Sequence, residues 1–245
     1  MKPITKMRDT YKPSEHFVSM DEGYRERIAN SRERLTAGTY RRLGTVVGLI
    51  VSNYIKSSKC AYSLGHPIDS LHEHLESSIS CAKEWEDVSL LERRYPDPLE
   101  WVGLCVLLDA DQSVFEDLAS ILDRDPVKDR LVESLLSYKL NDRQLDVGNI
   151  VGDGQLQLLK ALSLSATDKA EAQNQVRIYL EDHATLWLYG EGSTEKIPHT
   201  YDSGYYYGYW DYKSAAVSKL CGLDDSSYRD SKHYPVDLVD YKRQR

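Results

Sequence analysis

Two short motifs carry the residue types of a metal-dependent nuclease site. Pro96-Asp97 and Asp211-x-Lys213 could supply the carboxylates that hold Mg²⁺ and the lysine that orients the attacking water. In such sites the two halves normally lie close together on adjoining strands, whereas here they lie in opposite halves of the chain and in helical sequence. Asp97 also precedes Pro98 in the pattern of a helix N-cap followed by proline at the first helical position. The spacing therefore favours structural roles for both motifs over a nuclease site.

A group of histidines has residue types that bind zinc. His72 and His74 flank Glu73, with His66 and two cysteines nearby. Residues two apart on a helix point in different directions, whereas a shared zinc ion needs ligands three or four apart or on a turn. The chain has no Cys-x-x-Cys pair. We expect surface histidines on an amphipathic helix, and we expect neither a metal nor a cofactor.

Nucleophilic and phosphate-binding chemistry also lack their sequence signatures. His183 lies on the apolar stripe of a predicted helix, where a single histidine is more often a helix-face residue than a general base. No Gly-x-Ser-x-Gly elbow presents a nucleophile. Gly152-Asp153-Gly154 lacks both the Gly-x-Gly-x-x-Gly fingerprint and a Walker lysine, so it predicts a turn. The sequence therefore predicts a protein that is not an enzyme.

Apolar residues with helical spacing run through the N-terminal half. Asp21 can cap a charged helix that ends near Leu35, and the next helix should stop near residues 65–67, where glycine and then proline end helices. The apolar face of that second helix consists of Leu43, Val47, Ile50 and Tyr54. A third helix is predicted over residues 68–85, with Leu71, Leu75, Ile79 and Ala82 on its apolar face.

Capping signals place the later helices. Asp97-Pro98 and Asp125-Pro126 each put a capping carboxylate before a proline, and Asp111 opens a helix between them. Residues 156–164 and 176–188 continue the helical periodicity, and no sustained apolar–polar alternation predicts a strand. The sequence therefore predicts an all-α, bundle-like protein of two packed helical halves with short loops. The predicted domains are residues 5–124 and 125–242.

Charge and cysteine content bear on partners and compartment. The formal net charge of −8 repels nucleic-acid phosphates and favours basic partners. The N-terminal residues lack a signal-peptide core, and the longest apolar runs, 46–51 and 102–108, are too short to cross a membrane. Without an export signal, the four widely spaced cysteines predict reduced, buried thiols in a cytoplasmic protein.

The C-terminal segment combines aromatic rings, carboxylates and chain-breaking residues. Trp210, Val217 and Cys221 share one face of a short predicted helix that Gly222 ends, and the acids that follow can cap the next turn. This pattern favours a structural corner. Tyrosines beside exposed acids are also typical of binding faces, and the two interpretations are compatible. The candidate partner-binding residues are Tyr205, Tyr206, Tyr207, Asp224, Asp225 and Asp230.

The same segment resembles the C-terminal domain of the PoNe immunity proteins (PoNi). The resemblance rests on Gly208-Tyr209-Trp210, Ala215-Ala216, Gly222-Leu223-Asp224-Asp225-Ser226-Ser227-Tyr228-Arg229-Asp230 and Tyr234-Pro235-Val236-Asp237-Leu238-Val239. The N-terminal half is similar to the other domain of that family through Tyr62-Ser63-Leu64-Gly65-His66-Pro67-Ile68 and Trp85. Together the two domains cover most of the chain. Lys213 departs from the pattern, because a glutamate is expected there for a toxin contact or an internal ion pair.

The resemblance implies an antitoxin. Such proteins are helical and cytoplasmic, and they are encoded beside antibacterial effectors, often DNases delivered by contact-dependent secretion such as the type VI system. The protein would bind its cognate toxin, a basic nuclease domain, and block its active site, since an acidic inhibitor can be steered to a basic groove. Acidic helix faces such as Glu73 with Glu76, or Glu84 with Glu86, are rival contact surfaces. Two other classes stay open: a helical enzyme, such as a hydrolase, and an adaptor for a non-toxin protein.

Overall fold

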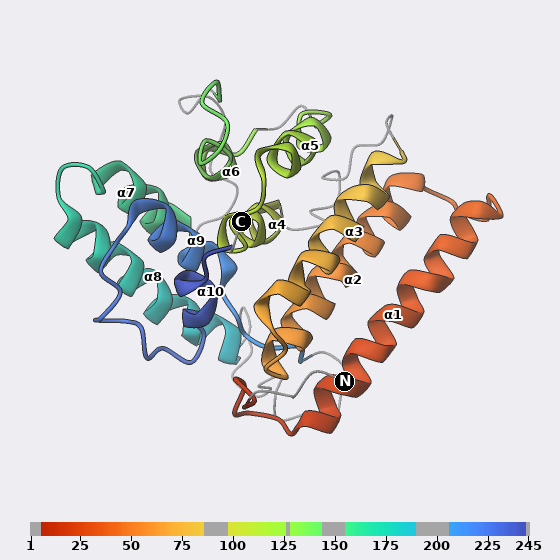
Figure 1. Ribbon diagram of the computed structural model, residues 1–245, viewed down its shortest axis with the longest axis horizontal. Coiled ribbons are helices and arrows are strands. Elements are labelled where there is room, and N and C mark those ends of the chain that lie inside the picture. The colour runs from red at the N-terminus through yellow and green to blue at the C-terminus, as the bar shows by residue number, and fades with distance from the viewer. Residues whose placement is uncertain (1–5, 86–97, 126–127, 144–154, 190–205, 244–245) are drawn as a thin grey trace.

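The chain folds into helices. The computed structural model describes residues 6–85, 98–125, 128–143, 155–189 and 206–243, without the side chains of residues 183–189. These ranges form ten α-helices and one 3-10 helix and contain no β-strand (Figure 1). The prediction of an all-α protein with two packed helical halves is confirmed.

Three helices dominate the N-terminal half. They are α1 (Ser14–Thr36), α2 (Leu43–Ser63) and α3 (Leu71–Lys83), with the 3-10 helix η1 (Ile68–Ser70) leading into α3. Since α2 packs extensively against both α1 and α3, it lies between them (Figure 1). The predicted apolar face of α3 is buried, and α2 ends just before Gly65 and Pro67 as predicted.

Asp21 does not begin α1. The helix starts directly after Pro13, and Asp21 lies within it on the buried side. Its carboxylate accepts a hydrogen bond from the Ser57 hydroxyl on α2 and pairs with the Arg25 guanidinium at 2.8 Å. The predicted cap was wrong because this acid has a partner on another helix, which a local capping pattern does not reveal.

The middle of the chain forms α4 (Pro98–Leu107), α5 (Gln112–Leu122) and α6 (Arg130–Leu136). As predicted, α5 begins after Asp111. The predicted helix start at Asp125 was wrong, because the Asp125 amide still bonds to the Leu122 carbonyl in the turn that ends α5. Asp129 caps α6 instead, and its carboxylate accepts from two backbone amides at 2.8 and 3.1 Å. The predicted cap Asp97 lies outside the described residues.

The C-terminal half contributes α7 (Leu156–Leu164), α8 (Lys169–Tyr189), α9 (Tyr212–Cys221) and α10 (Val236–Asp240). Trp210 was predicted on the face of α9, but the helix begins after Asp211, whose side chain caps it. Gly222 ends α9 as predicted, with a left-handed φ of 56° that glycine adopts at low cost. The predicted turn at residues 148–154 lies outside the described residues.

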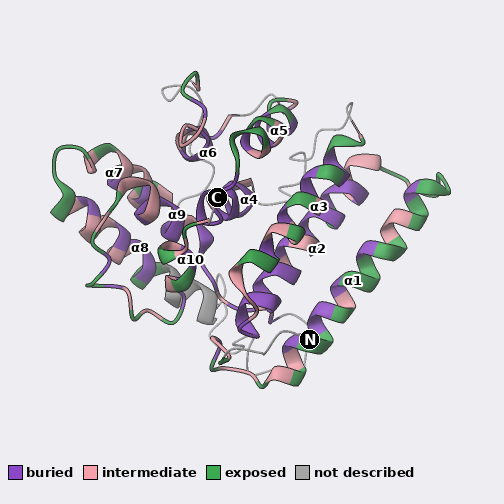
Figure 2. Ribbon diagram, viewed as in Figure 1, coloured by how far each residue is buried: buried purple, intermediate pink, exposed green. Residues whose placement is uncertain are grey.

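Helix α4 lies at the centre of the core (Figure 2). Each of its residues from Leu99 to Leu107 is buried, and the helix packs against α5, α6 and α9. One continuous apolar cluster therefore contains residues of both halves. The contact with α9 is close: a Cβ atom at Gly103 would lie 2.9 Å from the Tyr212 carbonyl oxygen. The alanines predicted to allow close approach, Ala215 and Ala216, are fully buried in this contact region.

All four cysteines are free thiols. Cys60, Cys81 and Cys105 are buried as predicted, and burial raises the pKa of the Cys81 thiol to about 11. Cys221 is only half-buried, in contrast to the prediction. None of the described helices combines the length and hydrophobicity that crossing a bilayer requires.

Candidate functional site

The first described tyrosine of the C-terminal segment lies inside the protein. Tyr206 is 1% exposed and belongs to a second, smaller apolar cluster with residues of α1 and of the end of α2, among them Phe17, Met20 and Cys60. The candidate Tyr205, next to it, lies outside the described residues. The segment thus attaches the C-terminal half to the N-terminal helices.

The hydroxyl and the carbonyl of Tyr206 are both engaged. Its hydroxyl donates to the Asp9 carboxylate at 2.5 Å, and the His16 Nε2 atom donates to its carbonyl oxygen at 2.7 Å. Because a carbonyl only accepts, His16 carries its hydrogen on Nε2. Burial, and then the charge of Asp9, raise the pKa of Tyr206 above its usual range. Tyr206 therefore stays neutral, and its position suits anchoring rather than proton transfer.

Gly208 and Trp210 fit the segment closely against the end of α2. Gly208 has a φ of 99°, and a Cβ atom there would lie 2.7 Å from both the Ser63 Oγ atom and the Trp210 ring. The indole Nε1 atom donates to the Ser63 hydroxyl at 2.8 Å, and the ring stacks edge-on against Tyr62 with centroids 4.8 Å apart. This tight fit requires glycine at position 208.

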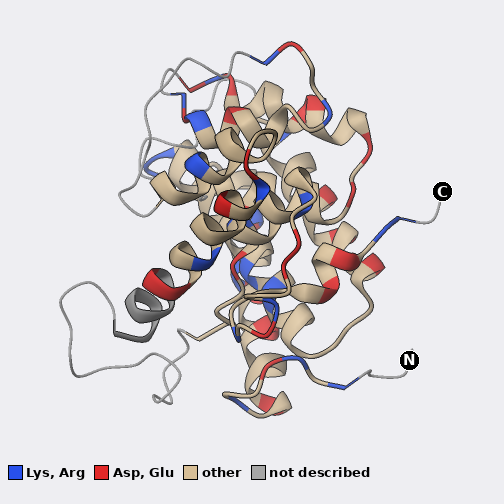
Figure 3. Ribbon diagram, turned by 90° about the vertical axis from the view of Figure 1, so that its left-hand side faces the viewer, with Lys and Arg blue, Asp and Glu red and all other residues tan. Residues whose placement is uncertain are grey.

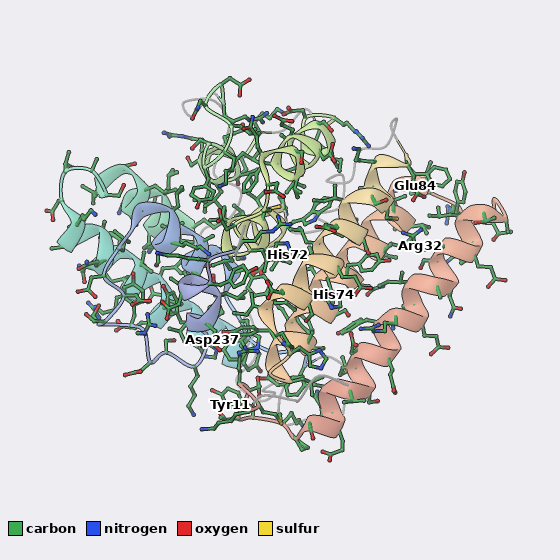
Figure 4. The ribbon with its side chains drawn as sticks, in the orientation of Figure 1. Tyr11, Arg32, His72, His74, Glu84 and Asp237 are labelled. Atoms are coloured by element: carbon green, nitrogen blue, oxygen red, sulfur yellow. The ribbon has the colours of Figure 1, made fainter. Side chains whose placement is uncertain are left out.

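The N-terminal segment joins the same region. Arg8 donates to the carbonyl oxygens of Tyr62 and His66, at 3.1 and 3.0 Å, where a cation favourably meets the C-terminal end of α2. The same guanidinium pairs with the Asp237 carboxylate of α10 at 2.5 Å. Figure 4 shows Tyr11 and Asp237 at the end of the molecule where the N-terminal segment passes the C-terminal half. Arg8 therefore links the two halves.

A cluster of buried charges joins α2, α4 and α9. The Glu100 carboxylate lies 2.9 Å from the Lys59 ammonium and 3.7 Å from that of Lys213, and the three side chains are only 11, 9 and 12% exposed. Burial disfavours the Lys59 ammonium, but Glu100 outweighs that effect and raises the pKa of Lys59 above its usual value. Lys213, where a glutamate was expected, thus takes part in an internal ion pair.

Asp211, the acid of the Asp-x-Lys motif, has a structural role. It is fully buried, and its carboxylate accepts from the Ser214 amide at 2.7 Å and from the Tyr179 hydroxyl at 3.0 Å. With Asp211 as a helix cap and Lys213 in an ion pair, neither residue is available for phosphodiester chemistry. Within the described ranges, no group of three or more histidines, cysteines and acids is arranged to hold a metal ion.

The two histidines of α3, labelled in Figure 4, each end a hydrogen-bond chain that runs through a hydroxyl to a carboxylate. The His72 Nε2 atom lies 3.3 Å from the Tyr241 hydroxyl, which donates to Asp69. The His74 Nδ1 atom lies 3.4 Å from the Ser57 hydroxyl, which donates to Asp21. Burial lowers the pKa of both histidines. The predicted surface position was wrong for both, since they are half-buried. The side chain of His183 lies outside the described residues.

The three acids of the candidate site have different surroundings. Asp225 is buried, and both of its oxygens accept from the Arg229 guanidinium at 2.9 Å. Asp224 and Asp230 are exposed, and the Asp224 carboxylate accepts from the Ser226 amide at 3.0 Å, a bond that lowers its pKa. Figure 3 shows acidic and basic residues interspersed over the C-terminal half. Only Asp224 and Asp230 of the three are placed to reach a partner directly.

Tyr207 is half-buried beside the buried charges. The ammonium groups of Lys56 and Lys59 lie 5.7 and 5.8 Å from the centroid of its ring, and its ring also meets that of Tyr24 edge-on. It therefore contributes to the attachment of the segment and keeps part of its surface exposed.

Two family models together match nearly the whole chain. The PoNe immunity protein (PoNi), N-terminal, model matches residues 8–120, and the PoNe immunity proteins (PoNi), C-terminal, model matches residues 127–238. The chain belongs to the PoNe immunity protein family. This PoNi protein keeps one core across both matched segments, because α4 of the first packs on α9 of the second.

A solved structure has the same fold as this PoNi protein. The crystal structure of protein PA2201 from Pseudomonas aeruginosa aligns with a TM-score of 0.68 at 19% sequence identity, covering 96% of this chain and 90% of that chain. At this identity the similarity concerns the fold alone. A comparison with curated proteins found no match.

Sequence reasoning missed several residues that build this region of the PoNi protein. Arg8, Asp9, Lys59 and Glu100 were not singled out, because each lies far along the chain from its partner. One signal was available: the lysine at position 213 in place of the expected glutamate indicated a change in a buried or partner-facing charge.

Proposed function

We propose that this PoNi protein binds a cognate antibacterial toxin and neutralises it without catalysis, by covering the toxin's active site. The match to both domains of the immunity family carries the proposal. A net charge of −8 supports a cationic partner such as a DNase domain, here proposed to be delivered by a type VI secretion system and met in the cytoplasm.

An enzymatic alternative gains little support from the Ser-His-Asp group between α1, α2 and α3. In a hydrolase the histidine stands between the serine and the acid. Here the Ser57 hydroxyl donates directly to Asp21, and His74 lies on its other side. Ser57 is also buried, so a substrate cannot reach it. The arrangement is suited to joining three helices.

The proposed function predicts protection from one toxin. It implies a toxin gene beside this one; that toxin is expressed in susceptible cells with and without the PoNi protein, and growth is measured. We expect growth to be restored and the two proteins to co-purify. A catalytically inactive toxin serves as the control for toxicity. Loss of growth with no co-purification would contradict the proposal.

The exposed acids of the C-terminal segment are proposed contacts. Replacing both Asp224 and Asp230 by lysine is expected to weaken toxin binding by about tenfold, because the new cations repel a basic partner. Calorimetry or surface-binding kinetics with inactive toxin measures the change, and circular dichroism checks that the variant is folded. Unchanged affinity in a folded variant would leave these acids with structural roles only.

A further inference from the structure

Helix α1 lies at the edge of the molecule and, among the helices, packs chiefly against α2 (Figure 1). Its inward face buries Phe17, Tyr24 and Ile28. Each residue turns a helix by about 100°, so steps of seven and four residues come close to two turns and one turn. Residues spaced by seven, four and seven therefore fall on one line along a helix. On the opposite, outward face of α1, a line of acidic residues has this spacing.

Four glutamates occupy the outward line. They are Glu15, Glu22, Glu26 and Glu33, and all four are exposed. We call them the α1 glutamate stripe. In the described part of the protein none of the four has a hydrogen-bond or ion-pair partner for its carboxylate. Glu22 and Glu26 also face each other one turn apart, a like-charge pair that costs about 0.2–0.5 kcal/mol.

The four arginines of α1 lie off the line of this stripe, and each has a contact within the protein. Arg25 pairs with Asp21 at 2.8 Å, and Arg32 lies 3.9 Å from Glu84 at the end of α3. Figure 4 labels Arg32 and Glu84 at the same end of the molecule. The guanidinium of Arg27 lies over the Tyr24 ring, and that of Arg34 donates to the Thr39 carbonyl. Arg27 and Arg34 keep their charges at the surface on other sides of the helix, so the outward line itself carries acids only.

An apolar residue lies beside the stripe. Val18, near Glu15 and Glu22, is 44% exposed, which is uncommon for a large apolar side chain in this protein's described residues. An apolar contact among charged ones is typical of protein interfaces, in which apolar contacts supply stability and charges supply orientation. A bound metal ion would not interact with the apolar side chain of Val18, whereas a protein surface would.

We propose that the outward face of α1 forms a second contact surface for the cationic toxin, besides the exposed acids of the C-terminal segment. This inference rests on the proposed function and names a further contact face. From Glu15 to Glu33 the stripe extends about 27 Å at 1.5 Å per residue, which is enough for a protein interface of standard size. Four acids spread along about 27 Å cannot all converge on one metal ion, and no metal-holding group of three or more ligands is found among the described residues. Acids spaced in this way match lysines and arginines spread over a protein surface. Nucleic acid is repelled by the same charges.

The test compares two double variants with the same change in charge. Glu22→Lys with Glu26→Lys reverses the middle of the stripe. Glu73→Lys with Glu76→Lys reverses two exposed acids on α3 and serves as the matched control. The probe is inactive toxin encoded beside this gene, and association and dissociation rates are measured at low and moderate salt. We expect about tenfold slower association for the α1 variant, a weaker salt dependence, and a change below about threefold for the α3 variant.

Each outcome decides a different point. If the wild-type protein binds the toxin and the α1 variant binds equally fast, the docking face is wrong while the proposed function stands. If association with the toxin slows as much for the α3 variant as for the α1 variant, net charge alone explains the slower association and the assignment to α1 is wrong. If the wild-type protein does not bind the toxin, the proposed function fails and this inference fails with it. Glu22→Gln with Glu26→Gln gives a milder second variant in case the lysine variant does not fold.

Discussion

Replacing Glu100 by leucine is expected to lower the free energy of unfolding by about 3–5 kcal/mol, because it leaves two buried ammonium groups without their shared carboxylate. Lys59 and Lys213 would then face each other across the space between α2, α4 and α9. Neither can move its charge to water easily, since both side chains are only about a tenth exposed. Urea or guanidinium unfolding followed by circular dichroism measures the loss.

A triple variant provides the control for this prediction. Lys59→Met, Glu100→Leu and Lys213→Met together remove both cations with the acid, and apolar replacement of a whole buried ion cluster is often tolerated. We expect the triple variant to regain most of the stability that the single variant loses. A Glu100→Leu protein within about 1 kcal/mol of the wild type would show that the cluster is hydrated and contributes little.

Neither half of the chain is expected to fold alone. Fragment 1–124 would expose the face of α4 that receives α9, where Gly103 lies against Tyr212. Fragment 125–245 would lose that support for α9 and the partners of Tyr206 and Trp210 on the N-terminal helices. Because a single apolar cluster spans the boundary, separation exposes core residues on both sides.

Co-expression of the two fragments tests this dependence directly. We expect each fragment alone to be insoluble or to lack a cooperative thermal transition, and the two together to co-purify with native helical content. Gly103→Leu in the N-terminal fragment should abolish co-purification, because the added side chain blocks the approach of α9. A cooperative transition in either isolated fragment would show that the boundary near residue 125 separates independent domains.

Helix positions were predicted well where the signal is local. The apolar faces of α2 and α3, the start of α5 at Asp111 and the end of α9 at Gly222 all follow from side-chain spacing or backbone conformation within a few residues. The starts predicted at Asp21 and Asp125 were wrong for the opposite reason. The Asp21 carboxylate bonds to another helix, and Asp125 still belongs to the turn that ends α5; only the contacts of the folded chain show either.

The C-terminal segment shows the same division. Its composition indicated rings that pack and acids that face outward, and its motifs indicated the immunity family. Composition could not show that Asp225 is buried with Arg229 while Asp224 is exposed, because adjacent acids have the same local pattern. The direction of each side chain depends on the turn that follows α9.

The sequence by itself determined the all-α class, most helix ends and the family of this protein, because periodicity, glycine conformation and motifs are properties of neighbouring residues. Only the tertiary structure showed which charged side chains pair inside the protein, as Lys59, Glu100 and Lys213 do. The 7-4-7 spacing of the α1 glutamates can be read from the chain, and the partners of Arg25, Arg27 and Arg34 lie within five residues of them. The burial of the opposite face of α1 and the pairing of Arg32 with Glu84 come only from folding. An uncompensated charge is a property of surroundings in space, and for that physical reason the proposed docking face became visible only in the folded protein.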